Sequence, residues 1–327
     1  MRPRPRPALL LLAMLLGSTA LGAAGERTFA LFSDSTSNSS PSLTADTDWA
    51  PPDVSASVIV KGAGGEPGYV RPGGSYYFYA DVRDSGNPAS GIASVSADAG
   101  LGLVTLSVGG PWTVAGVSHN HRSLLQTVPA GAPAGNYPYT VSSTDLDVPP
   151  HSQTQGGFSV TVDATAPAGS NVQSANGAAT VGRPEQDDGL TFTYSEPMEP
   201  ISILTGWDGT STSVVVHIDN AGGGDRLQVW NAANTIQLPL TNAAGLNLGR
   251  TDYVTTNRTF GASGTPSTMV RSGNSITITF GTASGTATTA AGSGTMSWTP
   301  SVTATDRAGN PASTSAVGEP GAADPEF

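Results

Sequence analysis

The chain has 327 residues, contains no cysteine, and carries a formal net charge of −11 from 14 basic and 25 acidic residues. Such a surface repels a phosphate backbone, so the composition argues against nucleic-acid binding. An acidic surface usually confers solubility, with calcium binding as a secondary role. The 41 glycines and 25 prolines make up about a fifth of the chain and predict many turns. Beyond the N-terminus, no apolar pattern recurs at helical spacing over three turns.

The first 24 residues have the layout of a secretory signal peptide. Positive charge at the start comes from Arg2, Arg4 and Arg6. The apolar run Ala8–Leu16 is too short to span a bilayer, and small residues then allow cleavage after Ala20 or Ala24. We expect residues 1–24 to be removed, which leaves about −14 of net charge because three basic residues are lost. No second run of spanning length follows, so we expect a secreted or cell-surface protein without a transmembrane segment in its mature part.

The absence of cysteine bears on domain size and source. An exported chain of this kind lacks the disulfide bonds on which small animal secreted domains rely. Its stability must come from hydrophobic cores, which favours domains of more than about 100 residues. Together with the Ala-, Gly-, Arg- and Pro-rich composition, this indicates a bacterial exported protein.

Residues 25–52 are rich in Ser, Thr, Asn and Asp and contain three prolines, so we expect an extended arm or linker. Within it, the run Thr28–Ser35 resembles the start of camelysin-type matrix proteins, in which an xFSD motif follows the signal peptide. The resemblance is confined to this run, and the rest of that family's domain is not evident. The protease activity of that family is therefore not carried over to this chain.

Short alternating apolar runs recur from Val54 to Val162 and predict seven or eight β-strands. The expected strands are Val54–Val60, Ser75–Arg83, Ile92–Ala97, Gly102–Val108, Trp112–Ser118, Arg122–Thr127, Tyr137–Ser143 and Gly157–Val162. Within Ser75–Arg83, alternation places Tyr77 and Tyr79 on one face and Tyr76, Phe78 and Ala80 on the other. Turn sequences rich in Gly, Pro and Asn separate them, among them one at Gly109–Pro111. This spacing over about 110 residues is typical of a β-sandwich, so we predict an immunoglobulin-like sandwich over residues 53–163.

Two further motifs extend this interpretation to a second domain over residues 164–315. The segment Asp163–Pro167 looks like the junction between tandem bacterial immunoglobulin-like modules, and the Asp163 side chain can accept backbone hydrogen bonds in its turn. Ser195–Pro200 (SEPMEP) and Asp306–Asn310 (DRAGN) resemble a strand–turn and a terminal turn in the immunoglobulin-like domains of bacterial surface-layer proteins. The resemblance implies an all-β protein with two tandem immunoglobulin-like β-sandwiches after the signal peptide and arm. The gap between the motifs is longer than that family shows, so we expect extra strands between Thr212 and Thr259, or a variant sandwich.

We expect residues 316–327 to form a disordered tail, because they are polar and acidic. Calcium is the metal that the sequence favours. Asp163, with Asp145 and Asp147 near the same end of the first domain, can supply the hard oxygen ligands that calcium prefers. No segment has the regular spacing of a calcium-binding loop, however.

Two tryptophans are candidates for a sugar-stacking platform. Trp207 and Trp298 both lie in turn-like sequence contexts. Packing in a core or turn is the more frequent fate of such residues. A change in tryptophan fluorescence on addition of polysaccharide would distinguish the two interpretations.

No residue pattern predicts catalysis. Glu196 and Glu199 flank Pro197 in a turn, which explains them without a glycosidase site. His119 and His121 alternate on one strand face but lack the third ligand that zinc needs. No G-x-S-x-G nucleophile elbow is present. We therefore expect no enzyme and no cofactor other than calcium.

The favoured function is a non-catalytic structural or adhesive module of a bacterial envelope or matrix. We expect it to bind an unidentified protein or polysaccharide through loops or edge strands. The first alternative is a carbohydrate-binding accessory protein, which a pull-down on polysaccharides would test. A secreted metallohydrolase of the camelysin type is the least favoured alternative and predicts EDTA-sensitive activity on casein.

Overall fold

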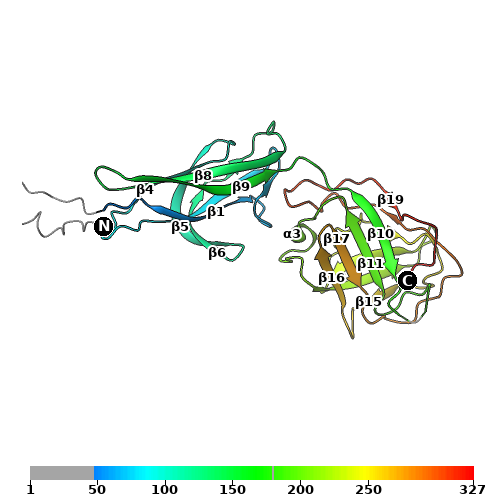
Figure 1. Cartoon of the computed structure of the whole chain (residues 1–327). Coiled ribbons are helices and arrows are strands. Elements are labelled where there is room, and N and C mark those ends of the chain that lie inside the picture. Colours follow the sequence, from blue (N-terminus) through cyan, green and yellow to red (C-terminus); the bar gives the residue numbers. More distant parts are fainter. Residues whose placement is uncertain (1–47, 179) are drawn as a thin grey trace, which may run out of the picture. The chain divides into compact units, whose positions relative to one another are not determined.

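The computed structural model describes residues 48–178 and 180–327. Within this part, the chain forms 19 β-strands in two sheets and one short helix, so the prediction of an all-β protein is confirmed (Figure 1). The expected signal peptide and most of the expected arm lie outside the described residues. We refer to β1–β9 as the first β unit and to β10–β19 with α3 and the following residues to Phe327 as the second β unit.

The first β unit begins at Asp53. Its strands are β1 (Asp53–Lys61), β2 (Tyr69–Val70), β3 (Ser75–Arg83), β4 (Ile92–Asp98), β5 (Leu103–Val114), β6 (Val117–Ser123), β7 (Gln126–Thr127), β8 (Gly135–Asp145) and β9 (Ser152–Val162). The sheet order is β1-β3-β6-β5-β4-β8-β9-β2, and β7 pairs with β3. All pairs are antiparallel except β2 with β9.

Strand β3 shows how local alternation produces the first core. Tyr76 and Phe78 are buried, whereas Tyr77 and Tyr79 on the opposite face are half-buried. Phe78 packs edge-on against Tyr139 of β8, with ring centroids 5.2 Å apart. Successive strand side chains point to opposite faces, so one strand contributes to both the core and the outer surface.

The turn predicted at Gly109–Pro111 is wrong. These residues belong to β5, which continues to Val114, and its register with β6 shifts between Val108 and Trp112. Gly110 has φ 87°, and a Cβ there would lie 2.8 Å from the carbonyl oxygen of His119. The glycine therefore accommodates a bulge within a pair of strands instead of ending the strand.

The second β unit has a longer and more irregular sheet. Its elements are β10 (Gly169–Ala175), β11 (Gly189–Tyr194), α3 (Pro200–Ile203), β12 (Thr212–Asp219), β13 (Arg226–Asn231), β14 (Leu246–Asn247), β15 (Arg258–Phe260), β16 (Ser267–Ser272), β17 (Ser275–Thr279), β18 (Ser297–Trp298) and β19 (Val317–Gly318). The sheet order is β10-β11-β17-β16-β12-β13-β14-β18-β19, and β15 pairs with β12. Strands β12, β13 and β14 lie between Thr212 and Thr259, and β15 to β18 follow before the DRAGN motif.

The prediction that residues 316–327 form a disordered tail is wrong. Strand β19 pairs with β18, and both Glu326 and Phe327 are buried. The Phe327 ring packs against Tyr253 and Phe280, with centroids 5.7 and 5.3 Å away. A polar composition conceals this packing, because a single aromatic residue anchors the segment to the core of the second β unit.

Candidate functional site at the junction

Six residues connect β9 to β10, and hydrogen bonds order this connection. The Asp163 carboxylate accepts a hydrogen bond from the backbone N–H of Thr165 at 2.9 Å, a turn of the kind that the sequence predicted. The backbone N–H of Ser313 donates to the Pro167 carbonyl at 2.8 Å, and that of Ser195 donates to the Ala168 carbonyl at 2.7 Å. The connection is therefore fastened to the second β unit. We call it, with the polar groups around it, the junction.

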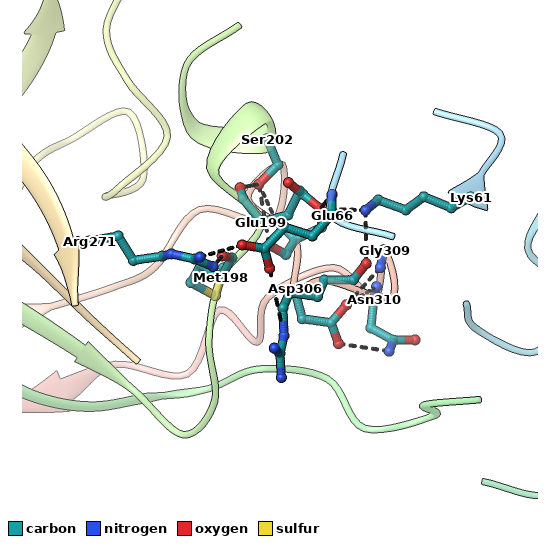
Figure 2. Close-up of polar contacts among 11 residues, drawn as sticks. Lys61, Glu66, Met198, Glu199, Ser202, Arg271, Asp306, Gly309 and Asn310 are labelled. Atoms are coloured by element: carbon teal, nitrogen blue, oxygen red, sulfur yellow. Dashed lines mark hydrogen bonds and ion pairs between the residues drawn. The ribbon is translucent and has the colours of Figure 1, made fainter. Parts of the chain in front are cut away.

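A buried ion pair joins the two β units at the junction (Figure 2). Lys61 lies at the end of β1, and Glu199 belongs to the SEPMEP motif; their side chains are only 9 % and 2 % exposed. The Lys61 ammonium also donates to the Arg307 carbonyl at 2.8 Å. The Glu199 carboxylate accepts a second bond, at 2.9 Å, from the backbone N–H of Glu66. Such a pair needs these extra hydrogen bonds to offset the desolvation of both charges.

The local sequence explains why the Glu199 side chain is available for this pair. Glu199 is the residue before α3, whose first residue is Pro200, and the backbone N–H of Ser202 donates to the Glu199 carbonyl rather than to its side chain. Its carboxylate makes no capping hydrogen bond. Two other hydrogen bonds hold the main chain at this residue. The Glu199 backbone N–H donates to the Thr305 carbonyl at 2.8 Å, and the Ser202 hydroxyl donates to the Glu199 carbonyl at 2.7 Å. The carboxylate is thus directed at Lys61 (Figure 2).

A more exposed set of charges surrounds Glu66, in the loop between β1 and β2. Arg271 of β16 forms an ion pair with Glu66 and donates to the Met198 carbonyl at 2.9 Å. Arg307 lies 3.8 Å from the other Glu66 oxygen and 4.0 Å above the ring of Tyr69. Partly exposed pairs of this kind contribute little stability individually, so their main effect is to determine which groups face each other.

The DRAGN motif builds the other side of the junction. Asp306 is 1 % exposed; one of its oxygens accepts from the backbone N–H groups of Gly309 and Asn310, at 2.7 and 2.8 Å. The Asn310 amide donates to the other oxygen at 2.8 Å and to the Asp163 carbonyl at 3.0 Å. Gly309 has φ 94°, a conformation that favours glycine. The motif therefore fixes its own turn and connects it to the end of β9.

Three carboxylates converge here. Asp163, Glu196 and Asp306 each offer an oxygen, and these oxygens lie within 4.8 Å of one another. Burial and then the negative charges of Asp163 and Asp306 raise the pKa of Glu196 to about 7. Burial also raises the pKa of Asp306, against the hydrogen bonds from Asn310 and Gly309. At this junction, these are the residues that could hold a hard cation.

The predicted calcium ligands Asp145, Asp147 and Asp163 are not brought together. Asp145 and Asp147 lie at the hairpin between β8 and β9, where the Asp145 carboxylate accepts from the backbone and ring of His151. Asp163 follows the other end of β9, a strand of 11 residues. At about 3.3 Å per residue the separation is roughly 35 Å, so one ion cannot bind all three.

The predicted sugar platform on Trp207 and Trp298 is also wrong. Trp298 is 0 % exposed and packs on Phe192 and Tyr194, with ring centroids 5.1 and 4.9 Å away. Trp207 is 4 % exposed, and its indole N–H donates to the Thr210 carbonyl at 2.6 Å. Both rings therefore belong to the core of the second β unit, and neither presents an open face to a ligand.

A different aromatic group lies on the outer face of the first sheet. Arg122 of β6 places its guanidinium carbon 4.8 Å from the ring of Tyr77 and 4.6 Å from that of Trp112, and Tyr79 lies alongside. All four are partly exposed, and within the described residues Arg122 has no carboxylate partner. The alternation of β3 pointed to the tyrosines, but only strand register adds Trp112 and Arg122. We call these four residues the Arg122 patch.

The remaining candidates are the two histidines of β6. His119 and His121 are buried, and neither belongs to a group of three metal-ligating side chains within residues 48–178 and 180–327.

No protein-family model matches the chain, and no curated protein matches its sequence. None of the described helices is long and apolar enough to cross a membrane.

Proposed function

We propose that the protein is a non-catalytic, exported structural or adhesive module of a bacterial envelope or matrix. The observation that carries this proposal is the junction, where the buried Lys61–Glu199 pair and the Asn310–Asp163 bond connect the two β units. Units joined by a short flexible linker move independently by default. A buried ion pair is satisfied in one arrangement only, which suits a module that holds or transmits position.

Strand order in the first β unit supports an immunoglobulin-like assignment. Its seven longer strands are β1, β3, β4, β5, β6, β8 and β9. Lettered A to G in chain order, they follow the order A-B-E-D and then C-F-G. A constant-type immunoglobulin sandwich has the same two sets in separate sheets, whereas here β4 and β5 pair and join the sets into one sheet. The second β unit has a different order, so we propose a variant sandwich there.

Fractionation of the native host with a specific antibody tests this function. We expect the protein in the wall, a surface fibre or the surrounding matrix. Recovery from the cytoplasm would overturn the proposal, because an adhesive module must be exported. Turnover of a polysaccharide or protein substrate by the purified chain would overturn the non-catalytic part.

The Arg122 patch favours a second candidate function, carbohydrate binding. Exposed aromatic faces stack on sugar rings, and a guanidinium without a carboxylate partner can pair with an anionic sugar. Pull-down on acidic polysaccharides should retain the intact chain and lose the variant Trp112→Ala. The variant Trp230→Ala, at a partly exposed tryptophan of the second β unit, is the matched control and should still bind. Equal retention of both variants would argue against the patch.

A further inference from the structure

A second group of carboxylates lies in the second β unit, close to β10 and β18. Glu319, Asp324 and Glu326 each offer one oxygen, and these oxygens lie within 4.8 Å of one another. Glu319 is 8 % exposed and Glu326 is 0 % exposed, whereas Asp324 faces solvent. Calcium binds oxygens at about 2.3–2.6 Å, so one ion can contact three oxygens spaced this closely.

The fold holds two of these carboxylates in place. The Gln173 amide donates to one Glu319 oxygen at 2.7 Å, and the backbone N–H of Met296 donates to the other at 3.3 Å. The Ser174 hydroxyl donates to Glu326 Oε2 at 2.6 Å. Gln173 and Ser174 both belong to β10, so a single strand positions both acids.

One oxygen in this group has no partner. Glu326 Oε1 is buried, and no hydrogen-bond donor reaches it. Among the described residues, no Lys or Arg forms an ion pair with Glu319, Asp324 or Glu326. An ionised carboxylate buried without a positive partner is strongly disfavoured. Glu319 and Glu326 are both buried with carboxylate oxygens within 4.8 Å of each other, so the site needs either a proton or a cation.

We propose that Glu319, Asp324 and Glu326 bind a calcium ion, with Glu326 Oε1 as the buried ligand. Two buried carboxylates and one exposed carboxylate provide hard oxygen ligands and a side open to solvent, from which water completes the coordination. The ion would fasten the segment from β19 to Phe327 onto the core of the second β unit. The acidic group at the junction differs, because none of the carboxylate oxygens of Asp163, Glu196 and Asp306 is both buried and without a hydrogen-bond partner. This inference does not depend on the proposed adhesive function.

Calorimetric unfolding of the full chain at pH 7.5, with calcium or with EDTA, tests the site. We expect calcium to raise the melting temperature of the intact chain. The variant Glu326→Gln should lose this response while melting in EDTA at least as high as the intact chain, because it removes a buried charge without changing the side-chain shape. The matched control Glu196→Gln, at the junction, should keep the full response.

Identical melting of the intact chain in calcium and EDTA would overturn the proposal and leave a shared proton as the explanation of the group. Loss of the response in Glu196→Gln but not in Glu326→Gln would overturn it as well, by placing the ion at the junction. Should Glu326→Gln fail to fold, the exposed variant Asp324→Asn provides the test. Titration calorimetry with calcium chloride should then show roughly tenfold weaker binding, since one of three protein ligands is lost, and unchanged affinity would contradict the site.

Discussion

The two β units differ in the buried side chains whose pKa values burial shifts, although both are mainly antiparallel sheets around an aromatic core. In the first β unit burial lowers the pKa of His121, a group that must stay neutral inside the protein. In the second, burial raises the pKa of Asp188 and Asp306. The surfaces also differ in charge, since the first β unit presents the cationic Arg122 patch and the second presents acidic groups. Similar sheets can therefore differ in ion binding and acid response through a few side chains.

The largest expected effect separates a core tryptophan from a surface tryptophan. Trp298→Ala should lower the free energy of unfolding by about 3–5 kcal/mol, because it empties a fully buried ring site in the second β unit. Trp112→Ala, in the Arg122 patch, should cost about 1 kcal/mol, because its ring is partly exposed. Urea unfolding followed by circular dichroism measures both. Comparable losses for the two variants would refute the distinction between core and patch.

The next effect concerns the junction between the units. Lys61→Met should destabilise the chain by about 3 kcal/mol, because the buried Glu199 carboxylate loses its counterion. Adding Glu199→Gln should recover much of that loss, since no buried charge then remains. Calorimetry should show the two β units unfolding in less closely coupled transitions in the single variant. A single variant as stable as the intact chain would mean that the pair is not buried in solution.

Acidification should affect the two units in opposite directions. Burial lowers the folded-state pKa of His121 below its ordinary value near 6.5, so its contribution to stability is complete above that value and is lost as the pH falls from there toward the folded-state pKa. The pKa of Glu196 is raised to about 7, so the contribution of Glu196 to folding stability is present below pH 4.5 and is lost as the pH rises toward 7. Melting curves of His121→Gln and Glu196→Gln between pH 5 and pH 7.5 measure each part. A pH profile unchanged by either substitution would contradict the assignment.

The smallest expected effect comes from the stacked guanidinium. Arg122→Ala should lower stability by about 1 kcal/mol, the size of an exposed cation–π contact. Arg122→Lys keeps the charge but loses the flat stacking surface, so its stability should lie between that of the intact chain and that of Arg122→Ala. Chemical denaturation resolves these differences. A loss above about 3 kcal/mol for Arg122→Ala would identify the residue as part of the core instead of a surface patch.

Features that depend on neighbouring residues could be predicted from the sequence. Alternation in β3 placed Tyr76 and Phe78 on one face and Tyr77 and Tyr79 on the other, because side chains in a strand alternate whatever the strand pairs with. Asp163 in its turn followed from side-chain chemistry that reaches only two residues along the chain. An all-β protein followed from these signals taken together.

Only the tertiary structure decided the features that join distant segments. Strand register brings Trp112 and Arg122 beside the tyrosines of β3, and the length of β9 separates Asp145 from Asp163. Trp298 is buried because the last strands close over a core formed mostly by earlier residues. The same closure lets Ser174 of β10 donate a hydrogen bond to Glu326. Pairing between strands brings Tyr69 beside Thr161 and Gly189 beside Thr279, and no local pattern in one segment specifies which partner it will meet. The sequence by itself therefore determined the type of structure, and the tertiary contacts determined its sites.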